Sequence, residues 1–137
     1  MQEFVEAIEP SEAILNTTLQ HWSLTETILG CCFDVMNELG VGFLEAVYKN
    51  ALIVALQQKG IYVQKEVLFE IIFRGAKIGH YIADMVVGGV IIELKCCKCL
   101  LPEHNAQVIN YLKAAKLSVG LLVNFGKYRL EFRRLYG

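Results

Sequence analysis

The fold is decided by the stretch Tyr81-Ile-Ala-Asp-Met-Val-Val-Gly-Gly-Val-Ile-Ile-Glu-Leu-Lys95. Two short apolar runs flank Gly88-Gly89, a dipeptide that takes the positive φ angles of a tight turn, so the stretch predicts a β-hairpin. Side chains on a strand alternate between faces, which makes Glu93 and Lys95 point the same way. Asp84 lies on the preceding run and comes within cross-strand reach of them if the hairpin pairs.

The charged side chains of this hairpin have two interpretations. Ionised groups in so apolar a frame cost on the order of several kcal/mol unless they are paired or hold a metal. Asp84, Glu93 and Lys95 are therefore either a functional site or a structural ion cluster at the edge of a sheet, because ion-pair networks imitate active sites. The remainder of the sequence is needed to choose between them.

The composition bounds the class of protein. A length of 137 residues predicts one domain. Apolar residues make up 55% of the chain, yet no run approaches the ~18 that a membrane span needs, so we expect no membrane partner. The apolar excess predicts a core plus an oligomer interface, and we expect a homodimer. The first residues lack the basic-then-apolar order of a signal peptide, which favours a cytoplasmic location.

The cysteines and the net charge exclude further classes. Cys31-Cys32 and the group Cys96, Cys97 and Cys99 fit neither a disulfide framework nor the usual zinc spacing, so we expect them to fill apolar space. A net charge of −1 is not typical of a strong nucleic-acid binder. Local clusters of cations remain, either as a binding surface or as solubilising charge. They are Lys127, Arg129, Arg133 and Arg134 near the C-terminus, and Lys95, Lys98 and Lys113 near the hairpin.

Two helices are expected before the hairpin. Residues 1–22 are interpreted as an appendage, with Ser11 capping a short helix. A longer helix is predicted from Ser23, which fits a capping box with Glu26, to the residue before Gly40. A second helix is predicted from about Phe43 to Gln58. Its core face is expected to carry a stripe at helical spacing, namely Leu44, Val47, Ala51, Val54 and Ala55.

The other elements define the fold class. Residues 61–73 alternate as a strand does, and Pro102 suits the first turn of a helix that runs to about Ala115. A continuously apolar run at 118–125 predicts a buried strand, and a last strand is expected over 128–135. The chain is therefore predicted to be α/β, with a mixed central β-sheet flanked by helices, one of which is a crossover.

Several blocks resemble a known family. Gly42-Phe-Leu-Glu45-Ala-Val-Tyr48 matches the G-x-x-E-x-x-Y signature of the GxxExxY proteins. The blocks Ala83-Asp84, Ile92-Glu-Leu-Lys95, Gln107-Val-Ile-Asn-Tyr-Leu-Lys113 and Gly120-Leu-Leu-Val-Asn-Phe-Gly126 also look like that family. The resemblance covers about residues 24–135, and the family is similar to the PD-(D/E)XK nuclease superfamily.

The resemblance implies a restriction-endonuclease-like core over residues 23–137 and a Mg²⁺-dependent nuclease, with Mn²⁺ as a substitute. It implies that Asp84, Glu93 and Lys95 are the catalytic D…E-x-K triad, and that Gln107 and Tyr111 are a Q-x-x-x-Y element that holds the nucleic acid or braces the triad. Four residues are the implied metal ligands: Glu45, Asp84, Glu93 and, through its backbone carbonyl, Leu94. A nucleic acid, DNA in preference to RNA, is the implied partner.

Each assignment has a structural alternative. Glu45 and Tyr48 could serve packing between helix and sheet, and Gln107 and Tyr111 could be an ordinary helix–sheet pair. Two positions depart from the family pattern, because Met36 stands where a histidine is common and Ile82 where a basic residue is common. For the whole chain, the alternative is a catalytically inactive nuclease-like module for binding or oligomerisation.

Overall fold

The computed structural model describes residues 12–137, with side chains from His21 onward. The elements follow in the order α1 (Glu12–Leu39), α2 (Glu45–Gln58), β1 (Gln64–Phe73), β2 (Ala76–Val87), β3 (Val90–Lys95), α3 (Pro102–Ala115), β4 (Val119–Asn124) and β5 (Glu131–Tyr136). This order confirms the predicted α/β class, with two helices before the hairpin and one helix between β3 and β4.

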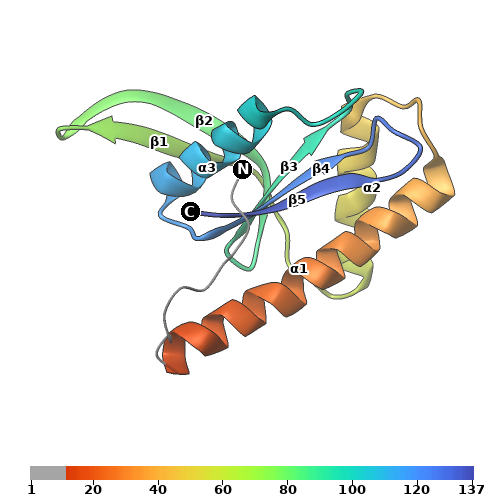
Figure 1. The fold of residues 1–137 in the computed structure, drawn as a ribbon, viewed down its shortest axis with the longest axis horizontal. Coiled ribbons are helices and arrows are strands. Elements are labelled where there is room, and N and C mark those ends of the chain that lie inside the picture. The colour runs from red at the N-terminus through yellow and green to blue at the C-terminus, as the bar shows by residue number, and fades with distance from the viewer. Residues whose placement is uncertain (1–11) are drawn as a thin grey trace.

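The strands form one mixed sheet in the order β1-β2-β3-β4-β5. All neighbouring strands are antiparallel except β3 and β4, which run parallel. A parallel pair needs a crossover connection, and α3 supplies it. Figure 1 shows α3 on one face of the sheet and α1 and α2 on the other, so the predicted flanked mixed sheet is confirmed.

The core lies on both faces of the two central strands. Ile92 and Leu121 pack with α1 and α2, whereas their neighbours Ile91 and Leu122 lie on the face that α3 covers. All four are fully buried. Strands that are buried on both faces have continuous rather than alternating apolar sequences. That is why the runs at the centre of the chain contain almost no polar residues.

The hairpin forms as predicted. Gly88 and Gly89 both have positive φ, +54° and +81°, which is the requirement of a type I′ turn. The turn sets the register by pairing Val87 with Val90 and Met85 with Ile92. The next residues along the two strands are Asp84 and Glu93, so the register brings the two carboxylates to adjacent positions.

The start of the first helix differs from the prediction. α1 begins at Glu12, and Ser23 lies inside it, where its carbonyl accepts a hydrogen bond from Thr27 Oγ1. The capping box predicted at Ser23 is therefore wrong. No glycine or proline occurs between Glu12 and Ser23, so nothing local ends the helix there. The predicted cap Ser11 lies outside the described residues.

The core face of α2 also differs from the prediction. Its buried residues are Tyr48, Leu52, Ile53 and Leu56. Three residues of the predicted stripe, Leu44, Val47 and Val54, are exposed instead, whereas its two alanines are half-buried and pack against the core. Apolar residues on this helix form two stripes at helical spacing, and periodicity cannot rank them. The stripe that is buried carries the tyrosine and two leucines, which remove more apolar area from water.

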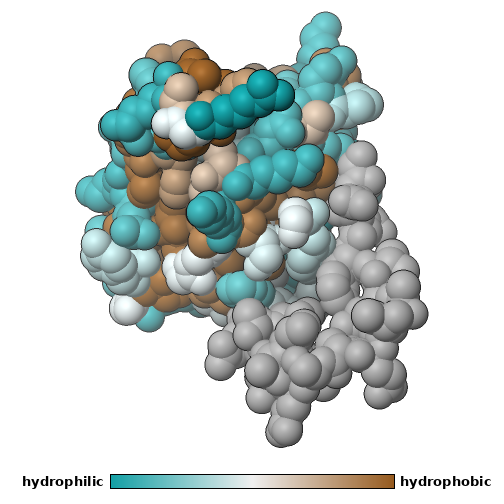
Figure 2. Space-filling view, turned by 90° about the vertical axis from the view of Figure 1, so that its left-hand side faces the viewer, coloured by the Kyte–Doolittle hydropathy of each residue, from teal (hydrophilic) through white to brown (hydrophobic). Residues whose placement is uncertain are grey.

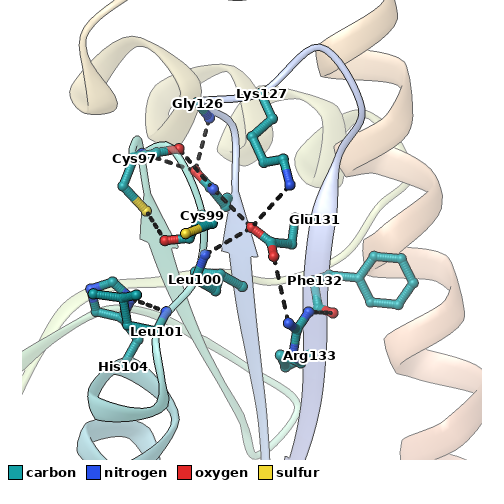
Figure 3. Close-up of polar contacts among 11 residues, drawn as sticks. Cys97, Cys99, Leu100, Leu101, His104, Gly126, Lys127, Glu131, Phe132 and Arg133 are labelled. Atoms are coloured by element: carbon teal, nitrogen blue, oxygen red, sulfur yellow. Dashed lines mark hydrogen bonds and ion pairs between the residues drawn. The ribbon is translucent and has the colours of Figure 1, made fainter.

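A buried asparagine holds the connection between β3 and α3 (Figure 3). Asn124 Oδ1 accepts hydrogen bonds from the backbone nitrogens of Cys97 and Gly126, at 3.0 and 2.9 Å. Its Nδ2 donates to Cys97 O at 2.9 Å and to Glu131 Oε1 at 3.1 Å. All four hydrogen-bonding positions of the amide are therefore used. The loop that follows Lys95 is fixed to the end of β4 by this side chain.

Glu131 extends the same cluster. Its Oε1 accepts a hydrogen bond from Leu100 N at 2.9 Å, and Arg133 lies 3.5 Å from Oε2. Burial raises the pKa of Glu131, but the hydrogen bonds from Asn124 and Leu100 and the nearby cations outweigh it, so the pKa lies below its ordinary value. Gly126 is required here, because a Cβ atom would overlap the backbone of Cys97.

The cysteines divide into two groups. Cys31 and Cys32 are residues of α1 and are buried in the core, as expected. Cys96 and Cys99 are exposed, so the expectation that they fill apolar space is wrong, whereas Cys97 is partly buried and packs against a core cluster. They lie in the loop after β3, where the hydrogen bonds of Asn124 rather than apolar packing fix the backbone.

We expect Asn124→Ala to lower the free energy of unfolding by about 2–4 kcal/mol, because it leaves buried backbone groups of Cys97 and Gly126 without partners. Urea unfolding measures the change. Asn50→Ala on the exposed side of α2 is the matched control and should change the free energy by less than about 1 kcal/mol. Equal effects of the two variants would contradict the role given to Asn124.

Candidate functional site

Asp84 and Glu93 form the centre of the candidate site. Glu93 Oε1 accepts a hydrogen bond from Asp84 N at 3.2 Å, and Asp84 Oδ2 accepts one from Leu94 N at 2.8 Å. Each carboxylate thus bonds to the backbone of the opposite strand. The predicted cross-strand approach is confirmed. Glu93 is only 7% exposed, whereas the Asp84 side chain is 19% exposed, so solvent reaches the site mainly past Asp84.

Burial and repulsion shape the ionisation of this pair. Burial raises the pKa of Glu93 to about 8, and the neighbouring charge of Asp84 adds to the rise. Lys95 acts in the opposite direction without cancelling it. Two carboxylates held this close cannot both ionise easily unless a cation lies beside them. The arrangement therefore favours a bound cation.

Two lysines approach the carboxylates from different elements. Lys95 extends from β3 and donates a hydrogen bond from Nζ to Gln107 Oε1 at 3.4 Å. Lys49 of α2 lies 3.9 Å from Asp84 Oδ1 and 2.9 Å from Glu66 Oε1. Among the described residues, no ion pair joins Lys95 to Asp84 or Glu93. The alternative of a structural ion cluster, in which Lys95 pairs with both carboxylates, therefore does not form.

Lys49 is a site residue that the sequence interpretation missed. Lys49 supplies a cation near Asp84. A basic residue is common in the family at the position of Ile82, and Lys49 brings positive charge to the same site from another element. A signal for it existed, because Lys49 follows Glu45 by four residues and such residues share a helix face. The helix was interpreted through its apolar stripe, and this polar face was not considered.

Glu45 is the first residue of α2 and lies beside the carboxylate pair. Burial raises its pKa, and the next cause is the charge of Asp84, while Lys95 and Lys49 lower it. The partial positive charge at a helix N-terminus favours an anion at this position. Glu45 therefore belongs to the same electrostatic cluster as Asp84.

Tyr48, its partner in the signature, has a different role. Its ring is fully buried and stacks on Phe125 with centroids 4.9 Å apart. Its hydroxyl donates to Gly40 O and accepts from Phe43 N. These contacts agree with the packing role considered for Tyr48. Its hydrogen bonds fix the loop that leads into α2, so Tyr48 acts on Glu45 only through the backbone.

Gln107 and Tyr111 face the site from α3. Gln107 accepts the hydrogen bond of Lys95 and also acts on Tyr111 through a side-chain hydrogen bond. Tyr111 stacks on Tyr81 with ring centroids 3.6 Å apart, and Tyr81 Oη donates to Tyr111 O at 2.8 Å. Phe69 extends the stack beyond Tyr81. Both residues of the predicted element thus lie at the site, one of them bonded to Lys95.

The comparisons with known proteins agree with this geometry. A family model described as the PD-(D/E)XK nuclease superfamily matches residues 22–135. The chain belongs to this superfamily. The predicted restriction-endonuclease-like fold is thereby confirmed. The narrower resemblance to the GxxExxY proteins remains a prediction.

Among solved structures, the one titled "Crystal structure of SSO0001" is similar to this PD-(D/E)XK chain. It has a TM-score of 0.51 and 22% sequence identity, and the match covers 66% of this chain and 48% of the other. At this identity the likeness concerns the fold alone, and the chain spans about half the length of that protein. No curated protein matches the sequence.

The donor set of the candidate site consists of carboxylate oxygens, which suit a hard divalent cation. Within residues 12–137, no group of three His, Cys, Asp or Glu side chains is arranged to hold a metal ion. Asp84 and Glu93 form a pair of hard oxygen donors instead. Mg²⁺ keeps several waters and is commonly bound by one or two carboxylates together with substrate phosphates. The two carboxylates therefore fit the chemistry of a divalent cation of this kind.

The cationic cluster near the C-terminus is engaged elsewhere. The Arg134 guanidinium lies 4.0 Å from the centre of the Trp22 ring and donates to Thr25. Lys127 and Arg133 pair with Glu131. These three cations stabilise contacts of the fold, whereas the fourth member of the cluster, Arg129, is exposed. No helix in the described part of the chain is long and apolar enough to cross a membrane.

We expect the stability of the metal-free protein to fall as the pH rises from about 5 to about 8. The folded state raises the pKa of Glu93 above its ordinary value of 4.5, so the protonated carboxyl is favoured. Its stabilisation is complete below that value and is lost through about pH 8. Urea unfolding at several pH values in a chelator measures the slope.

Glu93→Gln is the control, because the amide does not titrate, and its slope should be clearly flatter than that of the wild type. Identical slopes for the two proteins would show that the ionisation of Glu93 is not perturbed.

Proposed function

We propose that this chain is a divalent-metal-dependent nuclease that hydrolyses phosphodiester bonds in nucleic acid, with DNA preferred over RNA. The observation that carries the proposal is the pair Asp84 and Glu93, held together by backbone hydrogen bonds with Lys95 beside them. Membership of the PD-(D/E)XK superfamily supports a nuclease-like function. We place the nuclease domain at residues 23–137, with residues 1–22 as an appendage.

Asp84 and Glu93 are the proposed ligands of Mg²⁺, or of Mn²⁺ in its place. Glu45 and the backbone carbonyl of Leu94 complete the set, directly or through water. When bound, the ion polarises the scissile phosphate and lowers the pKa of a water molecule. The pKa of Glu93 is raised by burial and then by repulsion from Asp84, and a cation beside the pair would offset both, which supports this assignment.

Lys95 is the proposed catalytic cation. Its ammonium group lies on the same strand face as the Glu93 carboxylate and stabilises the negative charge that develops on the phosphate in the transition state. The Gln107 amide holds this ammonium by its hydrogen bond, and Tyr111 in turn contacts Gln107. Gln107 and Tyr111 are therefore proposed to orient Lys95, so that little reorganisation is needed during the reaction.

We expect the purified protein to cleave at least one of single-stranded, double-stranded and branched substrates when Mg²⁺ or Mn²⁺ is present. Lys95→Ala should lower the rate at least about 100-fold, because the charge in the transition state loses its partner. Lys98→Ala, a change of the exposed lysine three residues later, is the matched control and should retain the wild-type rate. Gel electrophoresis of labelled substrates measures the cleavage.

Asp84→Asn should abolish the binding of Mg²⁺ in calorimetric titration. Cleavage that is equal in wild type and Lys95→Ala would point to a contaminant and contradict the proposal. Binding of Mg²⁺ without any cleavage would support the alternative, a nuclease-like module that has lost turnover.

We also propose that the protein is a homodimer, built on the exposed stripe of α2. Leu44, Val47 and Val54 lie on one side of this helix and none of them is buried. Apolar residues gathered on one surface of a helix mark an interaction site. A cytoplasmic location is part of the same proposal, and the five free cysteines support it.

Light scattering after size exclusion should give twice the mass of the chain. Val54→Glu should convert the protein to a monomer, because a charge placed in an apolar interface is costly. Ile78→Glu, at a residue of β2 that is 63% exposed, is the matched control and should remain a dimer. A monomeric wild type at high concentration would rule the dimer out.

A further inference from the structure

A groove lies beside the candidate site and follows α3. It has a volume of about 790 Å³, and its walls are β1, through Ile71 and Ile72, and α3, through Gln107 and Tyr111. Gln107 also accepts the hydrogen bond of Lys95, so the groove and the candidate site share a residue. The groove therefore lies next to the site, and Gln107 stands between the groove and Lys95.

The far end of the groove is cationic. Lys113 and Lys116 line it and are exposed, as is the amide of Asn110. From Gln107 to Lys116 the helix rises about 13 Å, at about 1.5 Å per residue. The single acidic residue in the lining is Glu70, whose carboxylate pairs with Lys77 at 3.0 Å. The charge that remains for a ligand is positive.

The other walls of the groove suit a flat apolar group. Tyr111 ends the stack of three rings that begins at Phe69, and it lines the groove. Ile71 and Ile72 supply an apolar wall opposite α3. Figure 2 views the side of the molecule that carries the tip of the β1–β2 ribbon, where a broad apolar surface is crossed by hydrophilic side chains. Apolar and hydrophilic side chains thus alternate over this side.

We infer that the groove binds a single strand of nucleic acid and leads it to Lys95. Lys113 and Lys116 contact successive phosphates, and a base stacks against Tyr111. A cationic channel with an aromatic stacking surface is the combination by which proteins hold single strands without reading their sequence. The volume lies within the range of about 300–1,000 Å³ of small-molecule sites, which admits part of one strand and not a duplex.

The cleavage of the bound strand rests on the proposed nuclease function, whereas the binding of the strand in the groove does not. Binding is therefore measured without catalysis, in a chelator, by fluorescence anisotropy. The probes are labelled oligothymidylate, oligouridylate of the same length, and a duplex of that length. Both single strands should bind at least about tenfold more tightly than the duplex, because only a single strand enters the groove. The two single-stranded arms show whether the sugar is distinguished.

Three variants test the lysines. Lys113→Gln and Lys116→Gly should each weaken binding roughly threefold to tenfold, and each should reduce the slope of log K against log salt by about 0.7. Lys116 has a φ of +57°, a conformation that glycine adopts more easily, so Lys116→Gly should fold at least as stably as the wild type. Lys59→Gln, at the end of α2 on the opposite face of the sheet, is the matched control and should bind normally.

The outcomes separate this inference from the proposed function. Single-strand binding that is weakened in Lys113→Gln supports the groove even if no substrate is cleaved. Metal-dependent cleavage by a protein whose binding and salt slope are unchanged in both lysine variants would overturn the groove and leave the nuclease in place. Tighter binding of the duplex than of either single strand would also overturn it.

Discussion

The structure depends on two carboxylates that the β2–β3 hairpin forces together. Asp84 and Glu93 each accept a hydrogen bond from the backbone of the opposite strand, so they cannot separate without breaking contacts of the sheet. Their repulsion in a buried setting is unfavourable, and it is what makes the site demand positive charge. The surrounding elements meet that demand from two directions, with Lys49 from α2 and Lys95 from β3.

A second polar cluster, which binds the loop between β3 and α3, fixes the geometry around Lys95. Asn124 and Glu131 bond to the backbone of residues 97–100, between the end of β3 and the start of α3. Gln107, which accepts the hydrogen bond of Lys95, lies in the second turn of α3. The distance between these two side chains therefore depends on a loop held by buried hydrogen bonds. Such a cluster stabilises one arrangement only when every member is satisfied, as Asn124 is.

Local signals in the sequence predicted most of the fold. The Gly88-Gly89 turn predicted the hairpin and its register, because glycine permits positive φ angles. Pro102 predicted the start of α3, because proline restricts φ to a helical value. The start of α1 and the buried face of α2 could not be predicted in this way. Helix propensity contains no stop signal between Glu12 and Ser23, and α2 has two apolar stripes. The choice between them depends on the sheet against which the helix packs.

The same division applies to the site. Asp84, Glu93 and Lys95 were predictable because strand alternation and a two-residue turn fix their relative positions. The roles of Lys49 and Asn124 arise from contacts between elements far apart in the sequence. Helical spacing places Lys49 on the same face as Glu45, but it does not show the contact with Asp84. Asn124 nevertheless left a trace, as a polar residue in a strand that is otherwise apolar and buried. A buried amide of this kind requires partners, even when the sequence does not reveal which they are.

The net charge of −1 is a poor guide to what this surface can bind. Charged groups interact over about 8 Å at physiological ionic strength, so local arrangement decides the field that a ligand meets. In this chain the acidic groups Glu45, Asp84 and Glu93 gather at one point, and Lys95, Lys113 and Lys116 extend from it along α3. In the proposed function, a polyanion meets the cations first, and a metal ion neutralises the carboxylates. A nearly neutral chain can thus present both parts of a nuclease-like surface.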